Sequence, residues 1–243
     1  MTHRPRRWIR WSLTGVLTTV VAYGLIIIYP QPLFAYELQH AGIALHSDRP
    51  IPEAMRKTLE RARARVNRSA IADPARVPDV FICQSHWRFA LFARSHYNAG
   101  GLTDVVIGQH VFLRESDMEH DRLIGASGRP TPPDRPLSYF IAHEIMHLEH
   151  GRLVGRLGYL RLPKWVDDGH ADYVARDLDL SKALQGFKAG APELDPARSG
   201  LYVRYELMVA YLIEKQHVEP RDLLEHPRDP AVVERELAAL PTW

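Results

Sequence analysis

Two histidines and a glutamate stand together in residues 137–150, LSYFIAHEIMHLEH. His143 and His147 are four positions apart, so on a helix their imidazoles project from one face, one turn apart. Two such rings can bind one Zn²⁺ ion at about 2.0–2.1 Å. Glu144 is placed to reach a water on the metal, take its proton and pass it to a leaving amine. The spacing therefore predicts a zinc site that activates water for hydrolysis.

A third protein ligand is expected downstream, because a catalytic zinc ion keeps one position for water beside three protein ligands. Residues 163–175, PKWVDDGHADYVA, resemble the Trp-x-x-Glu-Gly-x-Ala-x-Tyr segment of gluzincin peptidases, in which the glutamate is the third ligand. The matching positions are Trp165, Gly169, Ala171 and Tyr173. The ligand position holds Asp168, 21 residues after His147 and near the spacing of that clan. The resemblance implies a zinc metallopeptidase with His143, His147 and Asp168 as ligands.

The aspartate at position 168 departs from the gluzincin pattern. Aspartate binds zinc at a similar bond length, but it is one methylene shorter than glutamate, so its helix must lie closer to the metal. Asp172 follows four residues later on the same helical face. We expect it to accept the free ring N–H of His143 or His147 and so to fix the tautomer; the gluzincin pattern also has an acid there. Asp167 is expected to face away.

Two further histidines lie near these ligands. His170 is a rival third ligand, but it is two positions from Asp168, so a helix cannot point both side chains at one metal. We expect His150 and His170 to be surface residues, with contact to a substrate as the alternative. A metzincin site is not expected, because it would need glycine at position 150 and a ligand at position 153, where this chain has leucine.

Peptide hydrolysis also needs a donor for the oxyanion that develops on the carbonyl. Residues 201–212 resemble the helix that follows the third ligand in small gluzincins, and that helix commonly supplies a tyrosine or histidine. Tyr202 is the first candidate here and Tyr205 the second, with packing aromatics an equal interpretation. The resemblance also implies that residues 105–113 form an edge strand above the zinc helix, which pairs with extended substrate.

The N-terminus has the composition of a membrane segment. Four arginines among residues 4–10 precede residues 11–36, which carry no charge. The most apolar part, residues 13–29, would nearly cross a bilayer core of about 30 Å as a helix. Arginines favour the cytoplasmic side, so we expect a single-pass signal-anchor in the inner membrane, with the remaining chain on the periplasmic side. A signal peptide cleaved after Ala35 is the alternative, although Leu33 stands where a small residue is preferred.

Composition and charge narrow the class further. The chain has 243 residues and a formal net charge of +2, but without the four leading arginines it has 27 basic and 29 acidic side chains. The charges are interspersed, which is typical of a solvated surface and gives no reason to expect a nucleic acid partner. Cys83 is the only cysteine, so no disulfide can form within the chain.

Hydrophobic periodicity locates the elements that must position these residues. We expect strands at residues 42–46 and 77–84, a strand or hairpin at 102–113, and a surface loop at 114–136. Helices are expected at 52–67, 137–157, 163–178, 201–217 and 230–240. The predicted fold class is α+β and zincin-like: a transmembrane helix, a small and mostly antiparallel sheet with helices, then the zinc helix and a C-terminal helical subdomain. The expected boundaries are 1–36, 37–136 and 137–243.

The expected function is zinc-dependent hydrolysis of peptide or protein substrates, with Glu144 as general base. One alternative is an inactive zinc-binding scaffold at the membrane, which the aspartate at position 168 would allow. Another is a zinc hydrolase of cell-wall bonds. An intramembrane protease is not expected, because the zinc helix carries charges and no further long apolar span follows.

Overall fold

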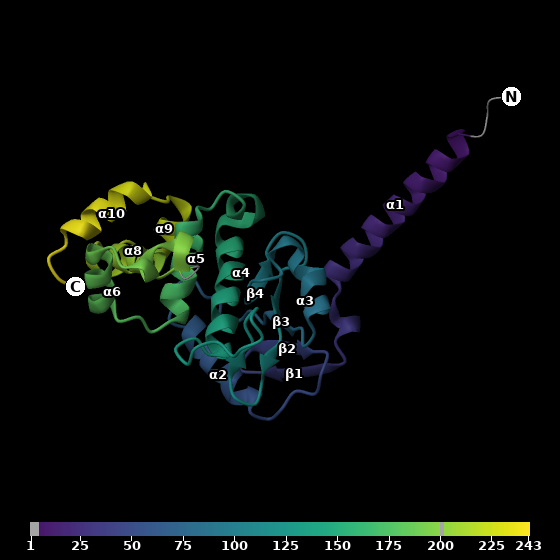
Figure 1. The fold of residues 1–243 in the computed structure, drawn as a ribbon, viewed down its shortest axis with the longest axis horizontal. Helices are drawn as coiled ribbons and strands as arrows, with labels where there is room; N and C mark the ends of the chain where they lie inside the picture. The colour runs from purple at the N-terminus through teal and green to yellow at the C-terminus, as the bar shows by residue number, and fades with distance from the viewer. Residues whose placement is uncertain (1–4, 200–201) are drawn as a thin grey trace.

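The structure is a computed structural model that describes residues 5–199 and 202–243 (Figure 1). The expected α+β class is confirmed. The helices are α1 Pro5–Ile28, α2 Met55–Val66, α3 His86–Ala93, α4 Leu137–Tyr159, α5 Lys164–Ala175, α6 Leu180–Ala189, α7 Pro196–Ser199, α8 Val203–Ala210, α9 Pro220–Glu225 and α10 Pro230–Ala239. Short 3-10 turns η1 Gln31–Leu33, η2 Arg94–His96 and η3 Pro192–Leu194 join them, and a π-helical turn, η4 Tyr211–Lys215, extends α8.

A five-stranded sheet lies before α4 in the chain. Its order is β1-β2-β3-β5-β4, with the bounds β1 Tyr36–His40, β2 Ile43–Ser47, β3 Asp79–Ile82, β4 Gly101–Asp104 and β5 His110–Leu113. The expectation of a mostly antiparallel sheet is wrong, because β2–β3 and β3–β5 are parallel and only the two outer pairs are antiparallel. Parallel neighbours need a crossover, which α2 supplies after β2 and α3 after β3.

The edge strand also differs from the expected one. Residues 101–113 form a hairpin in which β4 is the edge and β5 lies inside the sheet, fully buried. The interior position explains why Val111, Phe112 and Leu113 read as one apolar run, since a strand covered on both faces does not alternate. Strand β4 has intermediate exposure throughout and lies against α4.

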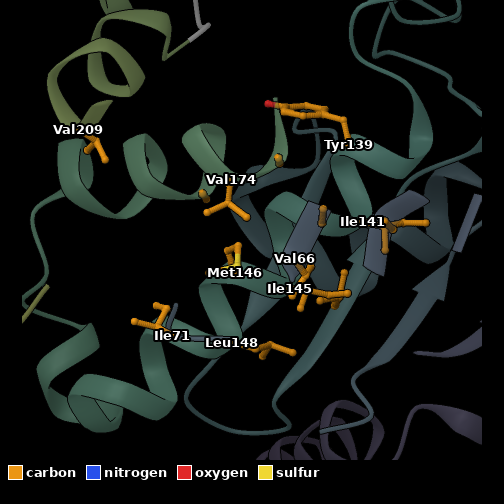
Figure 2. Packing of buried hydrophobic residues seen from close by; sticks show 14 of the residues in the cluster. Val66, Ile71, Tyr139, Ile141, Ile145, Met146, Leu148, Val174 and Val209 are labelled. Atoms are coloured by element: carbon orange, nitrogen blue, oxygen red, sulfur yellow. The ribbon is translucent and has the colours of Figure 1, made fainter. Parts of the chain in front are cut away.

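Helix α4 is the centre of the packing. It contacts α2, α5 and the strands β4 and β5 (Figure 1). Figure 2 shows Ile145 and Met146 of α4 among Val66 of α2, Val174 of α5 and Val209 of α8. Full burial of each such side chain stabilises the fold by about 1.5–3 kcal/mol. The largest core cluster therefore includes residues from both the sheet and the C-terminal helices.

The start of α4 is held by an acid from the preceding segment. Asp121 accepts hydrogen bonds from the Ser138 backbone N–H at 2.8 Å and from the Ser138 hydroxyl at 3.0 Å. Such a carboxylate satisfies free N–H groups of the first helical turn. The expectation that residues 114–136 form only a surface loop is wrong. This segment includes the strands β6 Ser116–Asp117 and β7 Arg122–Leu123, and Leu123 is 1% exposed.

Helix α1 projects from the rest of the molecule (Figure 1). Its residues 11–28 have a mean hydropathy of 1.9 and 6% of them are buried, so the helix is long and apolar enough to span a membrane. Below it, a second apolar cluster joins the chain after α1 to α3 and the sheet. The cluster is Phe34, Phe81, Cys83, Phe89, Phe92, Ala93 and Phe112.

Candidate metal centre

Three ligand atoms converge at the junction of α4 and α5. His143 Nε2 and His147 Nε2 lie 3.2 Å apart, and Asp168 Oδ1 lies 3.8 and 3.9 Å from them. Zinc bonds of about 2.0–2.2 Å in a tetrahedral site separate the ligand atoms by about 3.3–3.6 Å. The two imidazole nitrogens lie slightly closer together than that spacing, and the Asp168 carboxylate fits after an inward shift of a few tenths of an ångström. These groups are close enough to hold one metal ion.

The other nitrogen of each ring faces a carboxylate. His143 Nδ1 lies 2.8 Å from Asp172 Oδ1, although the ring N–H is not aimed straight at the oxygen. His147 Nδ1 lies 2.8 Å from Asp167 Oδ1. A carboxylate only accepts hydrogen bonds, so each Nδ1 carries the proton and each Nε2 presents a lone pair. When both rings are neutral, two lone pairs and the Asp168 oxygen therefore meet, which is the arrangement that a cation requires; in the metal-free protein a proton between the two Nε2 atoms takes that place.

In the metal-free protein, the same two histidines bind protons strongly. Burial alone would lower the pKa of His147, but the Asp167 carboxylate outweighs it and raises the pKa to about 10. The pKa of His143 is raised as well, because Asp172 more than offsets the effect of burial. The cluster thus attracts positive charge strongly, and a metal ion entering it must displace a proton.

A second group, His147, His150 and Asp167, also gathers within 4.8 Å. Its atoms, however, lie at hydrogen-bond distances from one another. Asp167 Oδ1 lies 2.8 Å from His147 Nδ1 and 2.6 Å from His150 Nδ1. These are lengths of direct charge-assisted hydrogen bonds, and they leave no room for an ion between the atoms. The pKa of Asp167 is strongly lowered, because the two histidines outweigh its burial.

Three expectations about neighbouring residues are therefore wrong. Asp167 does not face away from the site, because α5 crosses α4 at an angle that brings two successive aspartates to the histidines. His150 and His170 are not surface residues, being 0% and 1% exposed. His150 Nε2 lies 2.9 Å from His170 Nδ1, so His170 continues the hydrogen-bonded chain and does not approach the metal position.

Glu144 lies between the histidines and the edge strand. The Thr103 hydroxyl donates to Glu144 Oε2 at 2.7 Å and also lies 2.9 Å from the Glu144 backbone oxygen. A Cβ on Gly101 would come within 2.6 Å of Glu144 Oε1, so glycine at this position makes room for the carboxylate. Glu144 is 6% exposed, and β4 holds its carboxylate beside the candidate metal position.

A cleft of about 560 Å³ opens over these groups. Its lining includes His143, Glu144, His147 and Asp168, together with residues 98–103 of the edge strand and its approach. Tyr202 lines the cleft, with the Lys164 ammonium 4.5 Å from its ring centroid. Tyr205 stacks on Tyr202 at a centroid distance of 5.5 Å and supports it.

Tyr159 is a cleft residue that the sequence pattern did not indicate. As part of a straight helix it would lie about 18 Å from His147 along the axis. Helix α4 is interrupted at Gly155, where φ is +75° and ψ is 160°, a conformation that only glycine adopts easily. The chain turns there, and the Tyr159 ring comes within 6.4 Å of the His147 ring. Burial, and then Asp167, raise the pKa of Tyr159, so its hydroxyl stays a donor.

Behind the centre, charged groups alternate from α5 to α8. Asp172 accepts from the Tyr139 hydroxyl at 2.6 Å and from Arg176 at 3.1 Å. Arg176 reaches Glu206 of α8 at 3.2 Å. Asp172 was expected beside a ligand histidine, and it lies beside His143; Tyr139, Arg176 and Glu206 were not expected. Burial raises the pKa of Glu206 to about 8 although Arg176 opposes this shift.

Searches against family models, curated proteins and solved structures find no match to this chain.

Proposed function

We propose that this chain is a zinc-dependent peptidase held at a membrane by α1. The observation that carries the proposal is the convergence of His143 Nε2, His147 Nε2 and Asp168 Oδ1, with the Glu144 carboxylate beside them in an open cleft. The donor set favours zinc, which takes nitrogen and oxygen ligands and keeps one position open in its catalytic sites.

Several residues around the cleft then have a role in the reaction. The bound zinc would act as a Lewis acid toward a water and a peptide carbonyl. Glu144 accepts a proton from the attacking water and returns it to the leaving amine. The Thr103 hydroxyl holds the carboxylate toward the cleft. Tyr202 or Tyr159 donates to the oxyanion that develops on the carbonyl.

The edge strand supports a peptide substrate. Among the described residues, strand β4 ends the sheet and pairs with β5 alone. Residues 100–103 line the cleft beside Glu144. An extended peptide can add to such an edge by backbone hydrogen bonds, which places one peptide bond over the zinc position. The binding of backbone rather than side chains is consistent with cleavage of unstructured segments.

The test is the variant Glu144→Gln in the full chain, purified in detergent. We expect zinc content to stay near that of the wild type, while cleavage of a degenerate fluorogenic peptide library falls by about 10²–10⁴-fold. Glu119→Gln is the matched control, because Glu119 is exposed and lies outside the cleft. Equal cleavage by wild type and Glu144→Gln would overturn the proposal. Zinc binding without cleavage in the wild type would favour a scaffold, and release of cell-wall fragments alone would favour the other hydrolase.

A further inference from the structure

The last turns of α1 are fixed to the domain. The Tyr23 hydroxyl donates to the backbone oxygen of Leu91 in α3 at 2.8 Å. His110 Nε2 lies 3.1 Å from the backbone oxygen of Ile28, and Ile27 is 3% exposed. The turn between β4 and β5 packs here too, because a Cβ on Gly108 would meet the Ile27 oxygen at 2.6 Å. Helix α1 is therefore continuous with the domain and holds α3 beside it.

The position of Tyr23 along α1 sets the depth of α3. The apolar span runs from residue 11 to residue 28. A helix rises 1.5 Å per residue, so Tyr23 lies about 18 Å from the start of the span and about 8 Å before its end. The headgroup region adds about 5–7 Å on each side of a bilayer core of about 30 Å. With α1 across a bilayer and Ile28 at the boundary of the core, Tyr23 lies about 8 Å inside the core, so the Leu91 end of α3, to which it is bonded, reaches at least to the headgroup layer.

The side chains exposed near this level are of the kind found at membrane interfaces. Trp87 is 62% exposed and lies one helical turn before Leu91 on α3. Tyr97, just after η2, is 46% exposed, and Ile107 in the β4–β5 turn is 43% exposed. Arg88 lies over the Trp87 ring at 4.8 Å. Tryptophan and tyrosine rings concentrate at the headgroup level, whereas Arg88 is held by its ion pair with Asp48 and is not free to reach lipid phosphates.

We propose that Trp87, Tyr97 and Ile107 form a membrane-docking surface that inserts into the headgroup layer of the bilayer crossed by α1. This inference rests on the membrane anchor of the proposed function. It goes beyond the anchor, because a helix alone would leave the domain free to swing. The occupant is the lipid bilayer, since the surface adjoins the one helix of the described residues that can span it.

Docking in this way determines where the cleft opens. Residues 96 and 98–103 run from η2 into β4, and they line the cleft. The rim of the cleft is thus the direct continuation of the docking surface. A polypeptide that lies along the membrane surface, such as the flank of another membrane protein's span, reaches the edge strand without leaving the bilayer. The substrate class that fits is a membrane-bound polypeptide.

Site-specific labelling of the full chain in vesicles tests the proposal. Single variants Trp87→Cys and Ile107→Cys are labelled with a polarity-sensitive NBD dye and reconstituted into phosphatidylcholine–phosphatidylglycerol vesicles. Cys83 is 0% exposed and burial raises its pKa, so it does not compete for the dye. Ala238→Cys is the matched control, because Ala238 is exposed on α10, on the opposite side of the molecule from α1 (Figure 1). Leu17→Cys reports on α1 itself.

We expect blue-shifted emission at positions 87 and 107 and strong quenching by lipids with a nitroxide near the headgroup, with neither effect at position 238. Labels at 87 and 107 that behave like the label at 238, while position 17 is quenched, would overturn the docking surface and leave the anchor intact. Position 17 lies inside the core, so it is tested with a nitroxide on the acyl chain, and a label there that this nitroxide leaves unquenched would overturn both. Zinc content of each variant, measured in parallel, separates either failure from a failure of the metal centre, and two positions on different segments guard against one misfolded variant.

Discussion

Replacement of Asp167 by asparagine tests how far the hydrogen-bonded acids control the metal centre. Asp167 Oδ1 lies 2.8 Å from His147 Nδ1 and 2.6 Å from His150 Nδ1. Asparagine keeps an acceptor oxygen but loses the charge that makes His147 Nε2 a strong ligand. Removal of such partners lowers metal affinity by about 10- to 100-fold. For zinc binding corrected for the proton that His147 releases, we expect a loss of about 10-fold, or 1.4 kcal/mol, for Asp167→Asn and about 100-fold, or 2.7 kcal/mol, for Asp167→Ala, which loses both contacts. The correction is needed because the same carboxylate raises the pKa of His147 and so favours the competing proton.

The assay is a zinc titration of the metal-free full chain in detergent against a chromogenic chelator. Asp177→Asn is the matched control. Asp177 lies just after α5, and its carboxylate pairs with Arg65 and Arg68 and touches neither histidine. Circular dichroism checks that each variant is folded. Wild-type zinc affinity in both Asp167 variants would refute the reasoning, and so would an equal loss in Asp177→Asn, which would indicate a general effect of charge.

Four further predictions concern the His147 proton, the Glu144 carboxylate and the packing of Gly169. Zinc affinity should fall about tenfold for each pH unit below pH 10, because zinc must displace the His147 proton; titrations at several pH values check this. The raised His147 pKa also stabilises the metal-free fold fully below pH 6.5, and this contribution is lost as pH rises through about 10, which thermal unfolding with and without zinc will show. Thr103→Val should lower kcat with unchanged zinc content, because Glu144 loses its 2.7 Å partner. Gly169→Ala should lower the free energy of unfolding by about 1–3 kcal/mol through overpacking, since its Cβ would lie 2.6 Å from the backbone oxygen of Tyr205. Urea unfolding measures this change.

Local patterns predicted the helices that carry the candidate ligands. The expected helices 137–157 and 163–178 correspond to α4 Leu137–Tyr159 and α5 Lys164–Ala175. Their apolar positions recur at helical spacing, so the signal lies within each segment. The metal role of His143, His147 and Asp168 stays a prediction, as does the oxyanion role of Tyr202 and Tyr205.

What the patterns missed depends on contacts between distant segments. Asp167 reaches His147 because of the angle between α4 and α5, and that angle is not encoded in the spacing of either helix. Tyr159 enters the cleft because one glycine breaks a helix that periodicity alone would continue. Helix α3 is short, and its run HWRFALFA has no clear polar face, so the parallel strand order that depends on it was also missed.

Glu206 completes the row of charges behind the centre, and it lies on α8, late in the chain. During synthesis, residues 137–176 emerge well before this glutamate. Until α8 docks, Arg176 lacks its partner Glu206 and Asp172 lacks its final burial. The row of side chains from Tyr139 to Glu206 is therefore complete only after most of the chain has been synthesised.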